Sequence, residues 1–254
     1  SLPVEVNSLL LPIEGIPCIL SVVRDINERK RVTKETSLLE RLNLVGSMAA
    51  GIGQEIRNPL TTVRGFLQML IGKDEYSDYN NHLDLMLQEI DRASAIITDF
   101  ISLAKPKPAD SRRGNLNTII GILLPLLEAG AILYHKTIKT ELGEIADIPL
   151  DDKDIRQLIL NLARNGLDAM PPRGMLTIKT YQREKEISLS IQDQRKGIPP
   201  DVIDKVGTPF FTTKEYGVGL GLAVCYSIAA RHDASLTFDS SPTGTTFNVS
   251  FKIR

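Results

Sequence analysis

A heptad pattern of apolar residues over residues 38–70 constrains the fold of this chain more than any other feature. A second run with the same alternating steps of four and three covers residues 83–104, after a polar connector at residues 72–81. A seam of this length needs a partner helix, so the two runs predict a helical hairpin within residues 36–106. One hairpin buries only one stripe, whereas two copies would pair into a four-helix bundle, which predicts a homodimer. The first run consists of Leu38, Leu42, Val45, Ala49, Ile52, Ile56, Pro59, Val63, Phe66 and Leu70, and the second of Leu83, Leu87, Ile90, Ser94, Ile97, Ile101 and Ala104.

Gln54 is predicted to lie on the solvent-exposed face of the first helix. It falls two residues after Ile52 and two before Ile56, and two residues correspond to about 200° of helical rotation away from the seam. Asn58 lies four residues further on and shares this exposed face. Pro59 removes a backbone donor, so it should kink or loosen the helix just after Gln54. A purely structural coiled coil with a polar outer face is the alternative interpretation.

The run Ser47–Leu60 resembles the H-box of the sensor histidine kinases, whose usual text is close to A-G-x-x-H-E-x-R-N-P-L. The resemblance implies a phosphate-accepting histidine at position 54, where this chain has Gln54. A neutral carboxamide has no nitrogen of useful basicity, so autophosphorylation at this position is predicted to fail. The resemblance also implies that Glu55 is the base that activates the histidine, and that Asn58 orients the water that dephosphorylates a partner receiver domain.

A polar stripe accompanies a predicted helix over residues 153–170, for which Asp151 and Asp152 are good N-cap residues. The simplest explanation of the stripe is an exposed polar helix face. The helix is predicted to bury Ile155, Leu158, Ile159 and Leu162, and its polar stripe consists of Gln157, Asn161, Arg164, Asn165 and Asp168.

Residues 161–170 also resemble the N-box of the ATPase superfamily shared by histidine kinases, type II topoisomerases, Hsp90 and MutL. By this resemblance, the carboxamide oxygen of Asn165 is a ligand for magnesium, a hard ion that prefers oxygen ligands. Asn161 and Arg164 would then flank the phosphates of the nucleotide. The polar stripe is therefore interpreted as one wall of a nucleotide site.

Asp193 is the predicted reader of adenine. Two strands are expected at Met175–Tyr181 and Glu186–Asp193, and in the second an alternating apolar set ends at Asp193. A carboxylate at the end of an inward-facing apolar set needs a partner, because burying it unpaired is costly. The exocyclic amine of adenine would supply that partner.

Residues 193–199 resemble the family's D-x-G-x-G-I-P motif, which also places Gly197 and Ile198 at the nucleotide. Arg195 stands where the motif has its first glycine. If that position requires positive φ or close approach to the base, a bulky side chain costs stability or space. Weakened nucleotide binding or an altered pocket mouth is therefore expected.

Three further motifs extend the nucleotide-binding pattern. Thr208–Lys214 resembles the F-box, Gly217–Leu222 resembles the glycine-rich box, and Gly244–Phe247 resembles the terminal G-T-x-F element. The glycine-rich box precedes a predicted helix at residues 222–231, where backbone amides can approach phosphates. Asp233 departs from the usual H-G-G, which puts the tight turn there in doubt. By these motifs, Thr213, Lys214, Gly217, Gly219, Leu220, Gly221 and Thr245 belong to the site.

The N-terminal residues predict a β-hairpin, with strands at Val4–Leu11 and Cys18–Val23. Residues 24–30 resemble the D-I-T-E-R motif that closes PAS sensor domains. Residues 1–35 are therefore interpreted as the C-terminal remnant of a PAS domain, with an incomplete sheet, and a linker helix. An unrelated hairpin that leads into a helix is the alternative.

Charge and hydropathy limit the partners of this chain. The net charge of -1 gives no whole-chain electrostatic case for nucleic acid or an anionic membrane. No apolar run approaches the roughly 20 residues needed to span a bilayer, so no membrane contact is expected from this segment. A cytoplasmic location is expected, and a membrane anchor upstream of Ser1 remains compatible with it.

These patterns predict an α+β multidomain protein. A helical-hairpin dimerisation domain at residues 36–106 precedes an α/β sandwich ATP-binding domain of the histidine kinase/Hsp90-like type at residues 112–254. The family resemblance implies ATP and Mg²⁺ as cofactors, a response-regulator receiver domain as partner, and histidine autophosphorylation as the reaction, blocked here at Gln54. Four alternatives stay open: a kinase core inactivated by a single deliberate change, a degenerate pseudokinase that acts as phosphatase or dimer partner, a non-enzymatic scaffold, and a chaperone or topoisomerase ATPase.

Overall fold

The chain forms two compact units, residues 1–41 and 42–254. The first unit contains an antiparallel hairpin of β1 (Val4–Ile13) and β2 (Ile16–Asp25), as predicted, with longer strands than expected. Apolar side chains of this hairpin, such as Leu10, are exposed, and an isolated two-stranded ribbon is marginally stable at best. The computed structural model describes residues 4–13, 16–26, 42, 53, 55–71, 73–103, 111–214 and 217–253.

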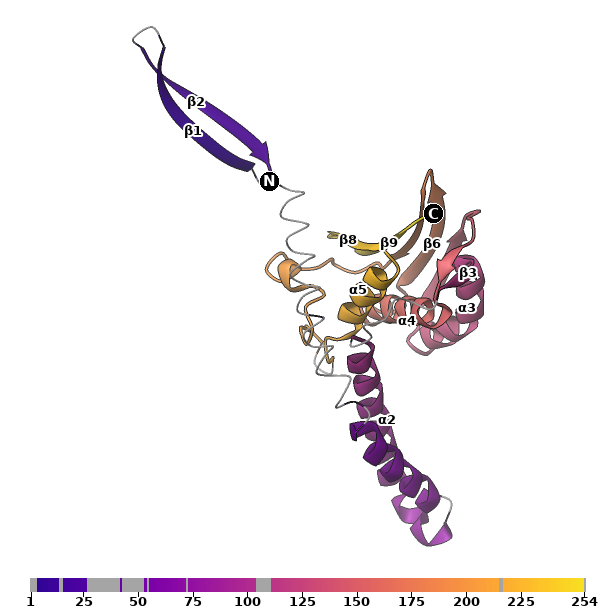
Figure 1. The fold of residues 1–254 in the computed structure, drawn as a ribbon. Helices are drawn as coiled ribbons and strands as arrows, with labels where there is room; N and C mark the ends of the chain where they lie inside the picture. The colour runs from indigo at the N-terminus through magenta and orange to yellow at the C-terminus, as the bar shows by residue number, and fades with distance from the viewer. Residues whose placement is uncertain are drawn as a thin grey trace. The chain divides into compact units, whose positions relative to one another are not determined.

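The predicted helical hairpin is present in the described residues of the second unit. Residues 55–71 are helical, and α2 (Asn80–Leu103) runs beside them after a short 3-10 turn, η1 (Asp74–Tyr79) (Figure 1). An ion pair of 2.6 Å between Arg64 Nε and Asp91 Oδ1 joins the two helices. The prediction of a helical hairpin is therefore confirmed for the described residues.

The heptad seam of the first helix is not covered within one chain. Ile56, Val63 and Phe66 are 41%, 44% and 63% exposed, whereas Leu67 on the same helix is buried. The apolar stripe is thus wider than one partner helix can cover. Gln54 lies outside the described residues, as do Leu38, Val45, Ala49, Ile52 and Ala104 of the predicted seams.

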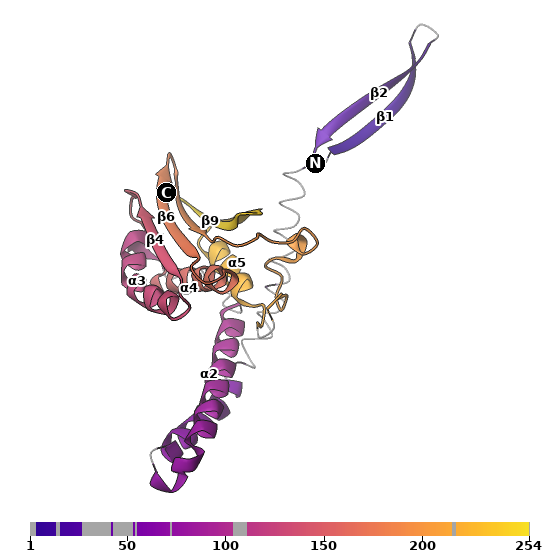
Figure 2. The ribbon, with the colours of Figure 1, turned by 180° about the vertical axis from the view of Figure 1, so that it is seen from behind.

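A five-stranded mixed sheet forms the centre of the C-terminal domain, in the order β4-β6-β7-β9-β8. β4 is parallel to β6, and the other neighbours are antiparallel. The helices α3, α4 and α5 cover one face of this sheet (Figure 1, Figure 2). A separate pair of short strands, β3 and β5, completes the domain. The elements are β3 (Arg112–Gly114), α3 (Leu116–Leu133), β4 (Thr137–Leu142), β5 (Ile148–Leu150), α4 (Asp152–Ala169), β6 (Met175–Arg183), β7 (Glu186–Gln192), η2 (Ile203–Lys205), α5 (Gly221–Arg231), β8 (Ser235–Ser241) and β9 (Gly244–Lys252).

The helix α4 forms as its cap and periodicity predict. The Asp151 side chain accepts hydrogen bonds from the backbone N–H groups of Lys153 and Asp154, at 3.0 and 3.3 Å, which satisfies two otherwise unpaired donors. The predicted apolar stripe packs into the core, and this fixes the rotation of the helix and turns its polar stripe away from the core. The stripe residues Ile155, Leu158, Ile159 and Leu162 are at most 1% exposed.

The helix α3 is the one helix among the described residues that is long and apolar enough to cross a membrane, by length and composition alone. The prediction that no apolar run approaches the length needed to span a bilayer was therefore wrong. However, Leu116, Ile120 and Leu123 are buried in the domain, and α3 packs against α4 and β4. The other face of α3 is exposed, with Leu126, Ile132 and Leu133 at 64%, 69% and 78%, so only 33% of the helix is buried.

The tight turn after α5 forms although Asp233 replaces a glycine. The Asp233 N–H donates to the Ala230 carbonyl at 3.2 Å, and the Ala234 N–H donates to the Ala229 carbonyl at 2.9 Å. This is the Schellman arrangement, in which the residue after the cap adopts a left-handed backbone. Asp233 has φ of 52°, so it occupies a conformation that favours glycine.

The substitution Asp233→Gly is therefore expected to raise the free energy of unfolding by about 0.5 kcal/mol, because it relieves the left-handed strain. The lost ion pair with Lys252, 3.7 Å long and exposed, contributes little. Urea unfolding followed by circular dichroism measures the change. Asp239→Gly, inside strand β8, is the control and should lower stability, since glycine weakens a strand. A loss of stability in Asp233→Gly would contradict the strain argument.

Candidate functional site

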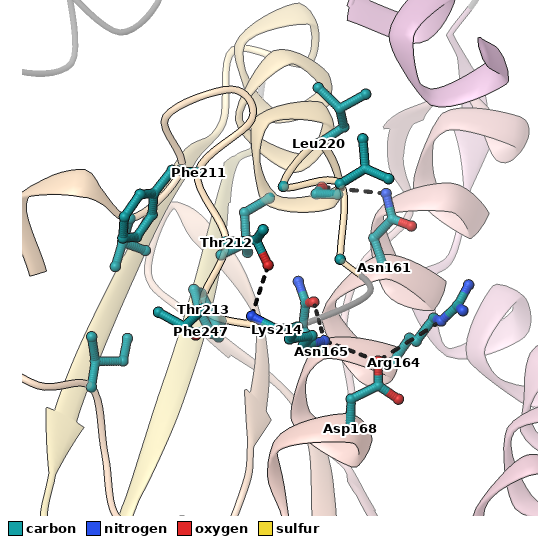
Figure 3. Close-up of a pocket in the computed structure, with 18 of the residues that line it drawn as sticks. Asn161, Arg164, Asn165, Asp168, Phe211, Thr212, Thr213, Lys214, Leu220 and Phe247 are labelled. Atoms are coloured by element: carbon teal, nitrogen blue, oxygen red, sulfur yellow. Dashed lines mark hydrogen bonds and ion pairs between the residues drawn. The ribbon is translucent and has the colours of Figure 1, made fainter. Parts of the chain in front are cut away.

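A cavity of about 950 Å³ lies beside α4, between the loop that follows β7 and the segment that leads into α5 (Figure 3). Every nucleotide-binding residue named from the sequence lines this cavity except Thr245, which is fully buried. The motifs thus converge on one place from distant parts of the chain. The predicted residues in the lining are Asn161, Arg164, Asn165, Asp193, Gly197, Ile198, Thr213, Lys214, Gly217, Gly219, Leu220 and Gly221.

Asp193 is a buried carboxylate in the cavity wall, only 2% exposed. Its Oδ1 accepts two backbone hydrogen bonds, from Thr245 N–H at 3.1 Å and from Arg195 N–H at 3.2 Å. Burial raises the pKa of Asp193 above its ordinary value, and the Arg195 guanidinium and the two N–H groups oppose that rise. Thr245 therefore acts through Asp193 and holds the carboxylate in position.

Arg195 turns its guanidinium back onto this carboxylate. Its Nε lies 3.4 Å from Asp193 Oδ2 and donates a hydrogen bond of 3.2 Å to Thr245 Oγ1. Its φ is negative, whereas Gly197 in the same loop has φ of 76°. The first-glycine position of the motif therefore does not require positive φ in this chain, and any effect of Arg195 comes from its side chain.

Polar groups at the other side of the cavity gather around Lys214. Its Nζ donates to Asn165 Oδ1 at 3.2 Å and to Asp168 Oδ2 at 2.9 Å, from the segment facing α4 (Figure 3). Arg164 Nε lies 3.9 Å from the same Asp168 carboxylate. Asn161 Nδ2 donates to a backbone carbonyl at the start of α5, at 3.3 Å. The polar stripe of α4 thus faces the cavity and contributes both charges and amide groups.

The glycine-rich segment allows close backbone approach at this point. Gly219 has φ of 74°, and a side chain there would collide with the backbone of Phe210 and Phe211. Gly221 is the first residue of α5 and lies against the carboxamides of Asn161 and Asn165. The N-terminus of α5, with its unpaired N–H groups, is therefore directed at the cavity.

The oxygen atoms at this end fit a magnesium ion that is bound together with phosphate. Asn165 Oδ1 and Asp168 Oδ2 already converge on one cation, the Lys214 ammonium. Magnesium in nucleotide sites takes one or two protein oxygens and completes its shell with phosphates and water. No group of three or more His, Cys, Asp or Glu side chains that could hold a metal alone occurs in the described part of the chain.

The predicted catalytic residues of the helical hairpin are exposed where they are described. Glu55 and Asn58 both lie on the surface of the first helix. The Asn58 carbonyl accepts a hydrogen bond of 3.2 Å from Thr62 Oγ1, in the turn that contains Pro59. The exposure of Gln54 itself remains a prediction.

The sequence did not indicate several residues of the cavity. Asp168 was part of the polar stripe of α4 but was not assigned a role, although its spacing placed it beside Arg164. Asp99 comes from α2, and its carboxylate accepts a 3.1 Å hydrogen bond from Gln157 Nε2. Burial raises the pKa of Asp99, against the hydrogen bond and the nearby Arg164. Other lining residues without a signal in the sequence are Arg92, Ala95, Ile96, Tyr134, Lys136 and Val206, whereas Phe247 ends the predicted G-T-x-F element.

Comparisons with known proteins agree with the two-domain pattern. Residues 44–108 match the His Kinase A (phospho-acceptor) domain, and residues 150–254 match the histidine kinase-, DNA gyrase B- and HSP90-like ATPase. Sporulation kinase C of Bacillus subtilis (strain 168) is 33% identical over 241 residues, which are 91% of this chain and 56% of the relative. The chain belongs to the two-component sensor histidine kinases.

Solved structures of histidine kinases share its fold. Full-length ShkA in complex with AMPPNP has a TM-score of 0.71 at 20% identity, over 82% of this chain and 46% of that chain. Histidine kinase ThkA in complex with response regulator protein TrrA has a TM-score of 0.60 at 22% identity, over 100% of this chain and 75% of that chain. The predicted fold class of this histidine kinase chain is confirmed, and the chain spans about half the length of the curated relative that it matches.

Proposed function

We propose that this chain is the kinase core of a two-component sensor histidine kinase and that its cavity holds ATP with Mg²⁺. The observation that carries the proposal is the pairing of a buried, hydrogen-bonded carboxylate, Asp193, with a polar cluster around Lys214 in one cavity. A carboxylate accepts a hydrogen bond from an amine of the base, and the cations and the helix N-terminus face phosphates.

Each part of the site has a distinct task in this proposal. Thr245 and the loop backbone orient Asp193, which binds the adenine amine. Asn165 supplies an oxygen for magnesium, which neutralises phosphate charge when bound. Lys214 then leaves its present partners for the phosphates, and Asn161 and Arg164 flank them. The apolar walls exclude water from the base, with Ile198, Val202, Val206, Leu220 and Phe247 among the lining residues.

The helical hairpin serves as dimerisation domain and phosphotransfer platform in this proposal, with domain limits near residues 36–106 and 112–254. Its exposed seam residues, such as Phe66, are the surface that a second copy would cover. In active members of the family, the phosphoryl group passes to the hairpin histidine and then to a response-regulator aspartate. Gln54 blocks the first of these steps, because its carboxamide cannot act as a nucleophile.

A second candidate function is dephosphorylation of a response regulator, or service as a dimer partner, by a chain that no longer phosphorylates itself. The exposure of Glu55 and Asn58 favours this function, because both remain accessible to a docked receiver domain while position 54 carries no phosphate. The test is the release of phosphate from a labelled receiver domain, measured with this chain and with its Asn58→Ala variant. Release that the variant loses identifies a phosphatase, whereas no release identifies a scaffold without activity.

Nucleotide binding is the direct test of the proposal. Isothermal titration with Mg-ADP should give saturable binding to the unsubstituted chain. Asp193→Asn should weaken it by about 10- to 100-fold, because one acceptor oxygen is lost in a buried site. The control Asp201→Asn changes an exposed carboxylate outside the cavity and should have no effect. Removal of magnesium with EDTA should also weaken binding of ATP. Equal affinities in Asp193→Asn and the control would refute this site.

A further inference from the structure

Both carboxylate oxygens of Asp193 already have partners within the chain. Oδ1 accepts the backbone N–H groups of Thr245 and Arg195, at 3.1 and 3.2 Å. Oδ2 faces Arg195 Nε at 3.4 Å. A carboxylate that reads adenine needs an oxygen available to the base amine, and in this chain the guanidinium already lies against that oxygen.

The guanidinium is held in this place by more than the carboxylate. Arg195 Nε donates to Thr245 Oγ1 at 3.2 Å, and that hydroxyl lies 3.3 Å from Ser240 Oγ. The Arg195 side chain is 25% exposed, so it is partly desolvated, and it lines the cavity together with Asp193. The contact is therefore charge-assisted, weakly screened by solvent, and positioned where the base would enter.

We propose that Arg195 is a specificity-determining residue that competes with the base for Asp193 and lowers the preference of the site for adenine over guanine. This inference rests on the proposed function of the cavity. Adenine presents an amine donor at position 6, which must displace or share Arg195 to reach Asp193 Oδ2. Guanine presents a carbonyl acceptor at that position, which an Asp193 carboxylate alone would repel and which the Arg195 guanidinium can donate to.

The substitution Arg195→Gly tests the proposal because it removes the competitor, and the negative φ of Arg195 shows that the backbone tolerates either residue. Titration with Mg-ADP should show about a 10-fold rise in affinity, and titration with Mg-GDP a fall, so the ratio of the two affinities rises by more than about 10-fold. Lys196→Gly is the matched control: it removes a positive charge from the adjacent, exposed position outside the cavity, and both affinities should stay unchanged.

Arg195→Gln is a second variant, which keeps most of the side-chain length without the charge. Thermal unfolding without nucleotide shows whether the glycine variant is folded. If it is not, the glutamine variant still tests the proposal. Its ADP affinity should rise by about 3-fold and its GDP affinity should fall, because a neutral carboxamide is a weaker donor to the guanine carbonyl than the guanidinium.

The possible outcomes separate this inference from the proposed function. If the unsubstituted chain binds ADP and neither variant binds it more tightly, the inference fails and the nucleotide site stands. An equal rise for ADP and GDP also overturns it, because Arg195 would then only narrow the entrance. If neither the unsubstituted chain nor any variant binds ADP or GDP, both the inference and the proposed function are wrong.

Discussion

The variant Gln54→His is expected to gain a phosphoryl label from ATP, whereas the unsubstituted chain gains none. An imidazole nitrogen can attack the γ-phosphorus and release ADP, but the carboxamide of Gln54 has no nucleophilic lone pair of comparable basicity. The neighbouring Glu55 and Asn58 are retained and exposed, so the change restores the one group that the H-box resemblance finds missing. We expect an increase of at least about 100-fold in incorporated label.

Incubation with γ-labelled ATP followed by acid and base treatment measures this gain, because a phosphohistidine is labile in acid and stable in base. The matched control is Gln54→Asn, another carboxamide, which should remain unlabelled. The double variant Gln54→His/Asp193→Asn should lose the label if the nucleotide comes from the described cavity. Acid-labile label on the unsubstituted chain, at position 54 or elsewhere, would contradict the proposed block.

The combination Gln54→His/Arg195→Gly connects this result with nucleotide recognition. If Arg195 weakens adenine binding, the second change should increase labelling at low ATP concentration and have little effect at saturation. Labelling that appears only in the combination would mean that Arg195, in addition to Gln54, prevents the reaction.

The sequence predicted those parts of the fold that have a clear period or a cap. The heptad runs gave the helical hairpin, and Asp151 with the apolar stripe gave α4 within one residue at each end. The helix α3 was not predicted, because its residues are apolar on nearly all sides and include Pro125, so no amphipathic period marks it. The short strands β3 and β5 have three residues each, too few for an alternation to be visible.

The candidate site was predictable where its residues share one element. Asn161, Asn165 and Asp168 follow helical spacing on α4, so their common face could be inferred before the structure. The hydrogen bond from Lys214 to Asn165 joins residues 49 positions apart, and only the fold brings them together. The contact between Arg195 and Asp193 is local, but it depends on the direction of a loop side chain, which sequence periodicity does not determine.

The substitution Arg231→Met is expected to lower the free energy of unfolding by about 3–5 kcal/mol. Its Nε and NH2 groups donate to Asp154 Oδ2 at 3.0 and 2.8 Å, between α5 and α4. The two side chains are only 9% and 3% exposed, so the loss of the guanidinium leaves a buried carboxylate without its ion pair. NH1 also donates to Ser227 Oγ at 2.8 Å and to the Ser102 carbonyl at the end of α2, at 3.3 Å.

Urea unfolding of Arg231→Met, compared with Arg156→Met, measures this contribution. Arg156 pairs with Asp152 at 2.6 Å on the surface of α4, so the loss of Arg156 should cost less than about 1 kcal/mol. The combination Arg231→Met/Asp154→Leu should recover most of the stability, because no buried charge then remains and the cavity left by the guanidinium is partly filled. If Arg231→Met and Arg156→Met cost the same, burial does not set the strength of the Arg231–Asp154 pair, and the junction between α4 and α5 depends on its apolar contacts instead.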